Sequence, residues 1–199
     1  MITLCMDTSH VFLSLGLIQN AHILASFQEE CWKKQSEEIF PRLIEICDSV
    51  HIGPENIDSI VISKGPGSYT GVRIAMTIAK MFCAMKNVPL YTIGTLQLYA
   101  GKNTCRVVTD ARGKRVYTNT FVNGIPASDD AALSCEDVRE INTDQTVIGD
   151  GHLIGCEDNW PNITENFLAT KDFWTPCENV HLVVPEYLKS ASSYMPQGK

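Results

Sequence analysis

A glycine-rich turn at residues 65–71 is the part of the sequence that best suits a chemical role. It reads Gly-Pro-Gly-Ser-Tyr-Thr-Gly and stands between an apolar run and a helical pattern, so backbone N–H groups and a helix dipole could hold an anion there. It lacks the Lys-Ser/Thr pair of a P-loop. The residues that would form such a site are Gly65, Gly67, Ser68, Gly71 and Arg73. The simpler interpretation, which the residues alone favour, is a turn that needs glycine for its conformation and close packing.

Two aspartates stand where apolar runs end, Asp7 after Ile2–Met6 and Asp110 after Arg106–Thr109. If these runs begin two related lobes, the carboxylates face each other across a cleft and could hold a metal ion bound to nucleotide phosphates. The alternative is that each aspartate caps its own turn, as aspartate after a strand often does. Asp7 and Asp110 are therefore candidates for a vestigial nucleotide cleft.

Other catalytic signals are missing from the sequence, which contains no HExxH, no closely spaced histidine pair and no GxSxG. His152 and Cys156 are four residues apart, but two ligands without a third are a weak metal signal. The 8 cysteines are scattered without a CxxC pair, which favours free thiols in a reducing compartment. We predict no catalytic residue, no metal site and no cofactor.

The composition is that of a globular chain of 199 residues, with 44% hydrophobic and 20% charged residues. The net charge of −7 disfavours binding of nucleic acid by this chain alone, because a polyanion is usually held by a basic surplus. The first residues lack the basic start of a signal peptide, and Arg73 and Lys80 interrupt the most apolar helical stretch. We expect a cytoplasmic protein that does not enter a membrane.

The elements that would position these residues follow from the apolar periodicity, which predicts an α/β fold. The first half has the order βββαβαβ, with strands at Ile2–Met6, Val11–Ile18, His22–Phe27, Ser59–Ser63 and Leu90–Ile93 and helices at Ser36–Val50, capped by Ser36, and Val72–Lys86. The second half repeats it in part, with strands at Arg106–Asp110, Val116–Val122, Thr146–Ile148 and Leu182–Val184 and a helix at Glu136–Ile141. We expect two related lobes, residues 1–100 with the glycine-rich turn and residues 101–199 as a smaller lobe with a polar tail.

The predicted helix Val72–Lys86 is apolar on nearly all sides. Its small residues Ala75, Ala79 and Cys83 form a stripe at four-residue spacing. A helix that lies on a sheet needs only one apolar face, so the other must be covered by the first helix, by another chain or by both. Burial wholly within this chain stays open as the alternative.

Several segments together resemble the TsaB family of bacterial tRNA threonylcarbamoyladenosine biosynthesis proteins. They occur in the family's order and read ITLCMDTS (2–9), SEEIFP (36–41), GPGSYTGVRI (65–74), DARGKRVY (110–117), Gly149–Gly151 and PEYLK (185–189). The resemblance implies the actin and Hsp70-like ATPase (ribonuclease H-like) fold, with two related lobes and an abbreviated second lobe. The sequence departs from the family's pattern at Gln35 and Lys64, where His and Arg are common, and it is short between Asp150 and Leu182.

What the resemblance implies for function is a non-catalytic subunit that pairs with the transferase TsaD, with TsaE joining. That complex installs threonylcarbamoyl on the adenosine next to the anticodon, so tRNA is met through the complex. Independently of the resemblance, the uncovered apolar face of the Val72–Lys86 helix predicts that two copies pair through the same helices when no partner is present. The implied interface lies on the two helices, at Ser36, Ile39, Phe40, Leu43, Ile46, Cys47, Val72, Met76, Ala79, Lys80 and Cys83. The alternatives are a nucleotide-dependent phosphotransferase or hydrolase of the actin-like class, and a metalloprotease, which the missing ligand spacing makes improbable.

Overall fold

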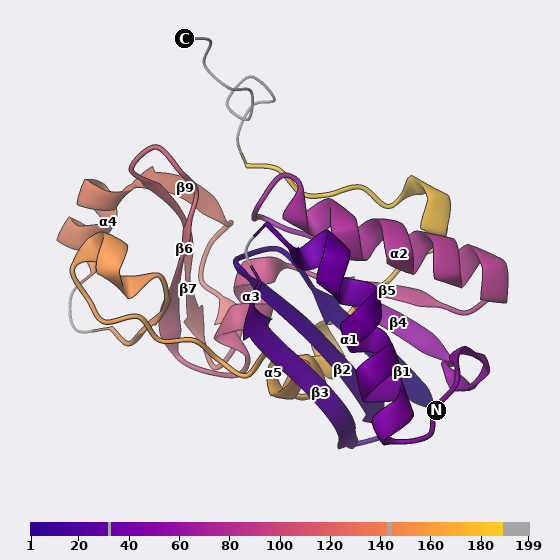
Figure 1. Cartoon of the computed structure of the whole chain (residues 1–199). Helices are drawn as coiled ribbons and strands as arrows, with labels where there is room; N and C mark the ends of the chain where they lie inside the picture. Colours follow the sequence, from indigo (N-terminus) through magenta and orange to yellow (C-terminus); the bar gives the residue numbers. More distant parts are fainter. Residues whose placement is uncertain (32, 143–144, 189–199) are drawn as a thin grey trace, which may run out of the picture.

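The computed structural model describes residues 1–31, 33–142 and 145–188 and shows two lobes side by side (Figure 1). The first lobe has the predicted order βββαβαβ. Its elements are β1 (Ile2–Asp7), β2 (Phe12–Gln19), β3 (His22–Glu30), α1 (Gln35–Ser49), β4 (Ser59–Ser63), α2 (Gly71–Lys86) and β5 (Leu90–Ile93), followed by the unpredicted α3 (Thr95–Ala100). The helix α1 starts at Gln35 after Lys34, so Ser36 lies inside its first turn and is not the predicted cap.

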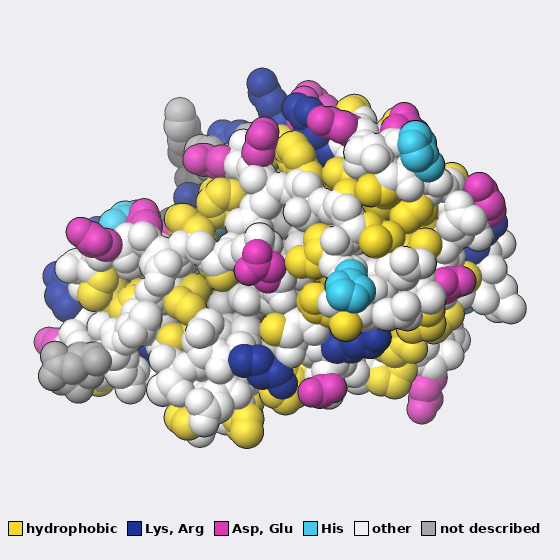
Figure 2. All heavy atoms as spheres, turned by 90° about the horizontal axis from the view of Figure 1, so that it is seen from below, with side chains coloured by type: hydrophobic (Ala, Val, Ile, Leu, Met, Phe, Trp, Pro, Cys, Tyr) yellow, Lys and Arg dark blue, Asp and Glu magenta, His cyan; other side chains and the backbone are white. Residues whose placement is uncertain are grey.

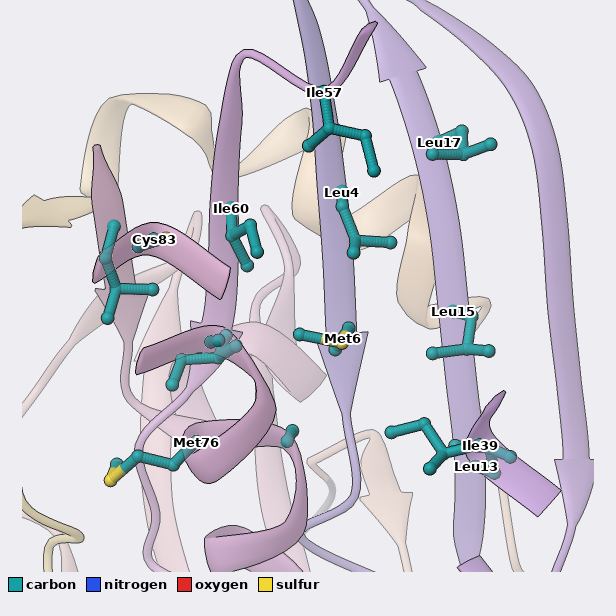
Figure 3. Close-up of a cluster of buried hydrophobic side chains, with 14 of the residues drawn as sticks. Leu4, Met6, Leu13, Leu15, Leu17, Ile39, Ile57, Ile60, Met76 and Cys83 are labelled. Carbon is teal, nitrogen blue, oxygen red and sulfur yellow. The ribbon is translucent and has the colours of Figure 1, made fainter. Parts of the chain in front are cut away.

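The first sheet has the strand order β11-β5-β4-β1-β2-β3. β1 is antiparallel to β2 and parallel to β4, and β4 is parallel to β5. The sheet is buried on both faces, which explains the continuous apolar runs in its central strands. On β4, Ile60 and Ile62 join the core under α1 and α2 (Figure 3), while Val61 points to the core on the other face, with Phe167 and Tyr99.

The second lobe is built around the strand order β10-β6-β7-β8, with β9 also paired to β7. Its elements are β6 (Cys105–Asp110), β7 (Arg115–Val122), β8 (Ile125–Pro126), β9 (Ala131–Ser134), α4 (Cys135–Ile141), β10 (Val147–Gly149) and a 3₁₀ turn at Gly151–Ile154. Three antiparallel strands, a helix and a parallel strand repeat the start of the first lobe, and no long helix and paired strand follow within the described residues. The second lobe is therefore abbreviated, as expected.

The chain then returns to the first lobe. The helix α5 (Ile163–Ala169) packs on β1, β2 and β3, and β11 (Thr175–Pro176) pairs with β5. Both segments were assigned to the second lobe from the sequence. The strand predicted at Leu182–Val184 is wrong: Val180–Leu182 forms a 3₁₀ turn, and the next residues run along α2. No described helix is long and apolar enough to cross a bilayer.

Candidate interlobe site and helix surface

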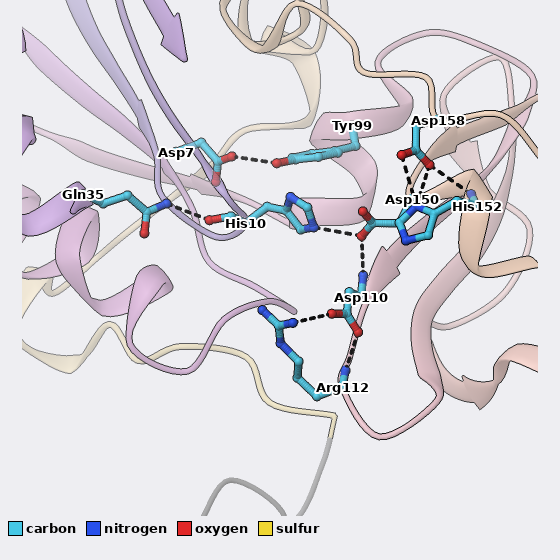
Figure 4. A network of polar contacts seen from close by, with 9 residues as sticks. All are labelled: Asp7, His10, Gln35, Tyr99, Asp110, Arg112, Asp150, His152 and Asp158. Atoms are coloured by element: carbon cyan, nitrogen blue, oxygen red, sulfur yellow. Dashed lines mark hydrogen bonds and ion pairs between the residues drawn. The ribbon is translucent and has the colours of Figure 1, made fainter. Parts of the chain in front are cut away.

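Asp7 ends β1 at the junction of the lobes but does not line the cleft between them (Figure 4). Its carboxylate is fully buried and accepts hydrogen bonds from the Ser9 backbone N–H at 3.0 Å, from the Ser63 hydroxyl and from the Tyr99 hydroxyl at 3.2 Å. Burial and then the Asp7 carboxylate raise the pKa of Tyr99 well above its ordinary value, so the phenol stays a donor. The prediction that Asp7 faces Asp110 as half of a metal-holding pair is therefore wrong.

Asp110 is at the equivalent position of the second lobe and has the same local role. Its carboxylate accepts a hydrogen bond from the Arg112 backbone N–H at 2.7 Å and forms an ion pair with the Arg112 guanidinium at 2.8 Å. Asp7 makes the same contact to the residue two positions on. Each aspartate thus caps its own turn, the alternative considered from the sequence. No group of three potential ligands for a metal ion is found in the part of the chain that the structure describes.

The cleft between the lobes has a volume of about 480 Å³ and is crossed by a buried contact that the sequence did not predict. His10 Nε2 lies 2.8 Å from Asp150 Oδ2, and the same oxygen accepts a hydrogen bond from the Asp110 backbone N–H at 2.6 Å. The His10 ring also packs on Trp160, with ring centroids 4.8 Å apart. Asp150 lies in the segment 149–151, but His10 lies just outside the segment 2–9, and their contact spans 140 residues.

The glycine-rich turn is held by close packing. The Ser68 backbone N–H donates to the Ser9 carbonyl at 2.7 Å, and a Cβ atom on Gly67 would lie 2.4 Å from that same oxygen. Arg73 stacks on the Tyr69 ring, with 3.8 Å between the guanidinium carbon and the ring centroid. The turn thus lies against the end of β1, and this favours the packing role over the anion site.

The C-terminal motif at 185–188 contacts the glycine-rich turn and the residue before it, an approach that no local sequence pattern predicts. The Glu186 carboxylate forms an ion pair with Lys64 Nζ at 3.1 Å, and the Glu186 backbone N–H donates a hydrogen bond to the Lys64 carbonyl at 2.7 Å. The Tyr187 ring stacks on Tyr69, with centroids 5.3 Å apart. Two segments that carry the family resemblance are therefore one structural unit.

The small-residue stripe of α2 is part of this chain's own core. Ala75, Ala79 and Cys83 are buried against the sheet, together with Val72 and Met76, and burial raises the pKa of the Cys83 thiol to about 11. The helix lies between the sheet, α1 and the segment 180–183, so most of its apolar residues, though not Met81 and Met85, are covered within this chain. The prediction that Val72, Met76, Ala79 and Cys83 form a docking surface is wrong.

Of the other predicted interface residues, most are buried or bonded within this chain and two are exposed. Ile39, Ile46 and Cys47 of α1 are in the core, and Leu43 is half-buried beside it. Lys80 donates to the carbonyls of His181 and Val183 at 3.0 and 2.8 Å, so it binds its own chain. Ser36 and Phe40 are exposed.

An exposed apolar surface remains on the outer side of these helices. Phe40 and Ile44 of α1 are 48% and 59% exposed, and Met81 and Met85 of α2 are 54% and 79% exposed. Each pair is spaced by four residues and forms one stripe of its helix, and the two helices contact each other in one layer (Figure 1). We call these four side chains the outer helix surface.

Near the cleft, His152 provides a test of the local electrostatics. Its Nδ1 lies 2.8 Å from Asp158 Oδ1, and this hydrogen bond raises the pKa of His152 above its ordinary value. We expect an NMR titration of the Asp158→Asn variant to show that pKa shifted downward. Because the folded-state pKa is raised, the pair stabilises the protein at pH values below the unfolded pKa and loses its effect as pH rises through the folded one. An unchanged titration would mean that the contact is not formed in solution.

Comparison with known proteins shows which families this chain resembles. A family model described as TsaD, tRNA N6-adenosine threonylcarbamoyltransferase, matches residues 25–141. The chain is 27% identical to the tRNA threonylcarbamoyladenosine biosynthesis protein TsaB of Bacillus subtilis over 223 aligned positions, which cover 97% of this chain and 96% of the relative. It is 30% identical over 101 residues to a TsaB protein of Buchnera aphidicola, covering 51% of this chain and 48% of that relative.

The fold is also that of a solved relative. The structure of YeaZ from Pseudomonas aeruginosa is similar with a TM-score of 0.74 at 21% identity, over 94% of this chain and 99% of that one. Together with the lobes described above, this likeness shows that the chain has the two-lobed α/β fold of that protein. The family model covers more than half of the residues. The chain therefore belongs to the TsaD family of threonylcarbamoyltransferase-related proteins and, within it, to the TsaB family.

Proposed function

We propose that this chain is a non-catalytic partner subunit of a TsaD-like transferase and takes part in the biosynthesis of threonylcarbamoyladenosine in tRNA. The observation that carries the proposal is the outer helix surface, formed by Phe40, Ile44, Met81 and Met85. Exposed apolar side chains on two adjacent helices fit burial against another chain better than they fit water. The helices are those of the interface that the family resemblance implies, but the side chains are largely different ones.

The cleft supports the non-catalytic part of the proposal. In an enzyme of the nucleotide-dependent class, carboxylates at the ends of the first strands would have to reach a metal-bound phosphate. Here the Asp7 carboxylate has three donors from its own chain and is buried, and Asp110 pairs with Arg112. Both carboxylates therefore have structural partners within this chain.

The charge distribution supports contact with tRNA through the complex rather than by this chain alone. The net charge is −7. On the face shown in Figure 2, the basic side chains are interspersed with acidic ones and form no continuous stripe among the residues drawn in colour. A protein that holds RNA by itself usually presents such a stripe. TsaD, with TsaE joining it, would provide the contact.

Co-expression with TsaD from the same organism tests the proposal. We expect wild-type chain and TsaD to elute together in size-exclusion chromatography, and the double variant Ile44→Arg/Met81→Arg to elute apart from TsaD. An unpaired charge buried in an interface costs several kcal/mol, enough to lose a micromolar complex. The melting temperature of the free variant should change little, because both side chains are exposed in the free chain.

The control is Ile125→Arg, which places one such charge on a similarly exposed isoleucine of the second lobe. This variant should still bind TsaD. If the double variant binds TsaD as the wild type does, the contact lies elsewhere and the outer helix surface is not the interface. In the absence of TsaD, we propose that two copies pair through the same surface, and the double variant should then be a monomer by light scattering.

A further inference from the structure

Within the described residues, the second lobe has no counterpart of β5, the last strand of the first lobe's repeat, and the position of such a strand can be recognised. In the first lobe, β5 pairs with β4 in parallel, on the side of β4 away from β1. The strand of the second lobe that is equivalent to β4 is β10, which pairs in parallel with β6 as β4 does with β1. Gly65 and Gly149 follow or end these strands with similar positive φ angles of 109° and 105°, which supports the equivalence. The side of β10 away from β6 is thus where the fifth strand of the repeat, the counterpart of β5, would lie.

The backbone of β10 shows how much of that edge is still open. The Thr146 carbonyl and the Asp150 N–H bond to β6, so the alternation of a parallel strand turns the N–H and C=O of Val147 and Gly149 away from it. At Gly149 these groups pair with the backbone of Asn159, at 2.7 and 3.1 Å. The Val147 carbonyl accepts a long hydrogen bond, at 3.4 Å, from the Asn159 side-chain amide. Asn159 alone therefore makes the contacts on the edge of β10 that a neighbouring strand would make.

A groove of about 470 Å³ lies along this edge, lined by Gln145, Val147 and residues 156–159. Its charged side chains are acidic. Asp158 is paired with His152, whereas Glu157 is exposed beside the groove. A second copy of this chain would bring the same carboxylates against these, so like charges oppose self-pairing at this edge. The groove suits an extended segment that carries positive charge.

We propose that the β10 edge is a docking site for an extended, basic segment of a partner chain, which adds to the second sheet as a strand. A main-chain bond to the Val147 N–H would supply affinity, and basic side chains near Glu157 would supply specificity. The alignment with the Bacillus subtilis relative spans 223 positions, more than the 199 residues of this chain, so that relative has residues that this chain lacks. The proposal concerns a different surface from the outer helix surface and does not depend on the proposed function.

Amide hydrogen exchange measured by NMR tests the proposal, with the blocked peptide Lys-Val-Lys-Val-Lys-Val as the probe. We expect the peptide to slow exchange of the Val147 amide by about tenfold or more at saturation. The neighbouring Ile148 amide is the internal reference, because it faces β6 and should not change. The peptide Glu-Val-Glu-Val-Glu-Val, with the same pattern and opposite charge, should have no effect.

Two charge reversals complete the test. Glu157→Lys should weaken binding of the basic peptide by about tenfold or more, whereas Glu178→Lys, at an exposed glutamate near β11, should leave it unchanged. Both positions are exposed, so both variants should fold. The proposal is overturned if the basic peptide does not bind at millimolar concentration, if it binds without slowing the Val147 amide, or if Glu157→Lys binds it as well as the wild type.

Discussion

Replacing Ala79 by arginine is expected to prevent the chain from folding. Ala79 is fully buried where α2 crosses the first sheet, among Ile60, Ile62 and other core residues. An arginine there would have to bury an unpaired charge and force α2 off the sheet, at a cost of several kcal/mol. Because natural domains are stable by only about 5–15 kcal/mol, this change removes much or all of the stability. Soluble yield and a thermal melt by circular dichroism measure the effect.

Met81→Arg is the matched control, two residues further along the same helix. Its side chain points outward and is 54% exposed, so the arginine can stay in water and the melting temperature should be close to that of the wild type. Comparison of the two variants distinguishes the buried side of α2 from its exposed side. A well-folded Ala79→Arg protein would show that α2 meets the sheet with a different side than the structure gives.

The second large effect is expected from Gly71→Ala, at the start of α2. A Cβ atom there would lie 2.2 Å from the Thr8 carbonyl oxygen and 3.0 Å from the Ser68 Cβ, so the glycine-rich turn and the end of β1 would have to separate. Overpacking of this kind typically costs about 1–3 kcal/mol. We expect a lower midpoint in urea unfolding, with the slope of the transition unchanged.

Gly94→Ala is the control for that experiment. A Cβ atom on Gly94 would have its nearest neighbours at 3.9 and 4.0 Å, an ordinary contact distance, and the residue has a φ of −61° that alanine adopts readily. Its unfolding midpoint should fall much less than that of Gly71→Ala, because the expected loss is only that of a weaker N-cap at the start of α3. Equal stability of both variants would show that the close approach at Gly71 is absent in solution.

The order of the elements could be predicted because it depends on local patterns. Asp7 and Asp110 follow their strands as expected, and the repeat around them is confirmed by the same turn contact in each lobe. The error at Ala79 has a physical reason: a helix apolar on most sides shows that it is covered, but the pattern does not say by what. The segment 180–183, more than 100 residues away along the chain, supplies part of that cover.

The contacts of the cleft could not be predicted for the same reason. His10 and Asp150 are 140 residues apart in the chain, and the spacing of side chains within one segment gives no sign of a contact over that distance. The helix α5 is a different case, because it had a local signal. The Asn162 side chain accepts a hydrogen bond from the Glu165 backbone N–H, and an asparagine three residues before a glutamate is a typical start of a helix.

The return of α5 and β11 to the first lobe connects the two lobes twice. The chain enters the second lobe after Ala100 and leaves it before Ile163, whose helix then completes the core of the first sheet. Two tethers permit rotation about the line that joins them but oppose free reorientation, so any movement between the lobes is restricted to a hinge. For the same reason, a cut at residue 100 would not release an independent domain. The piece 1–100 would lose α5 from the face where Phe167 is buried.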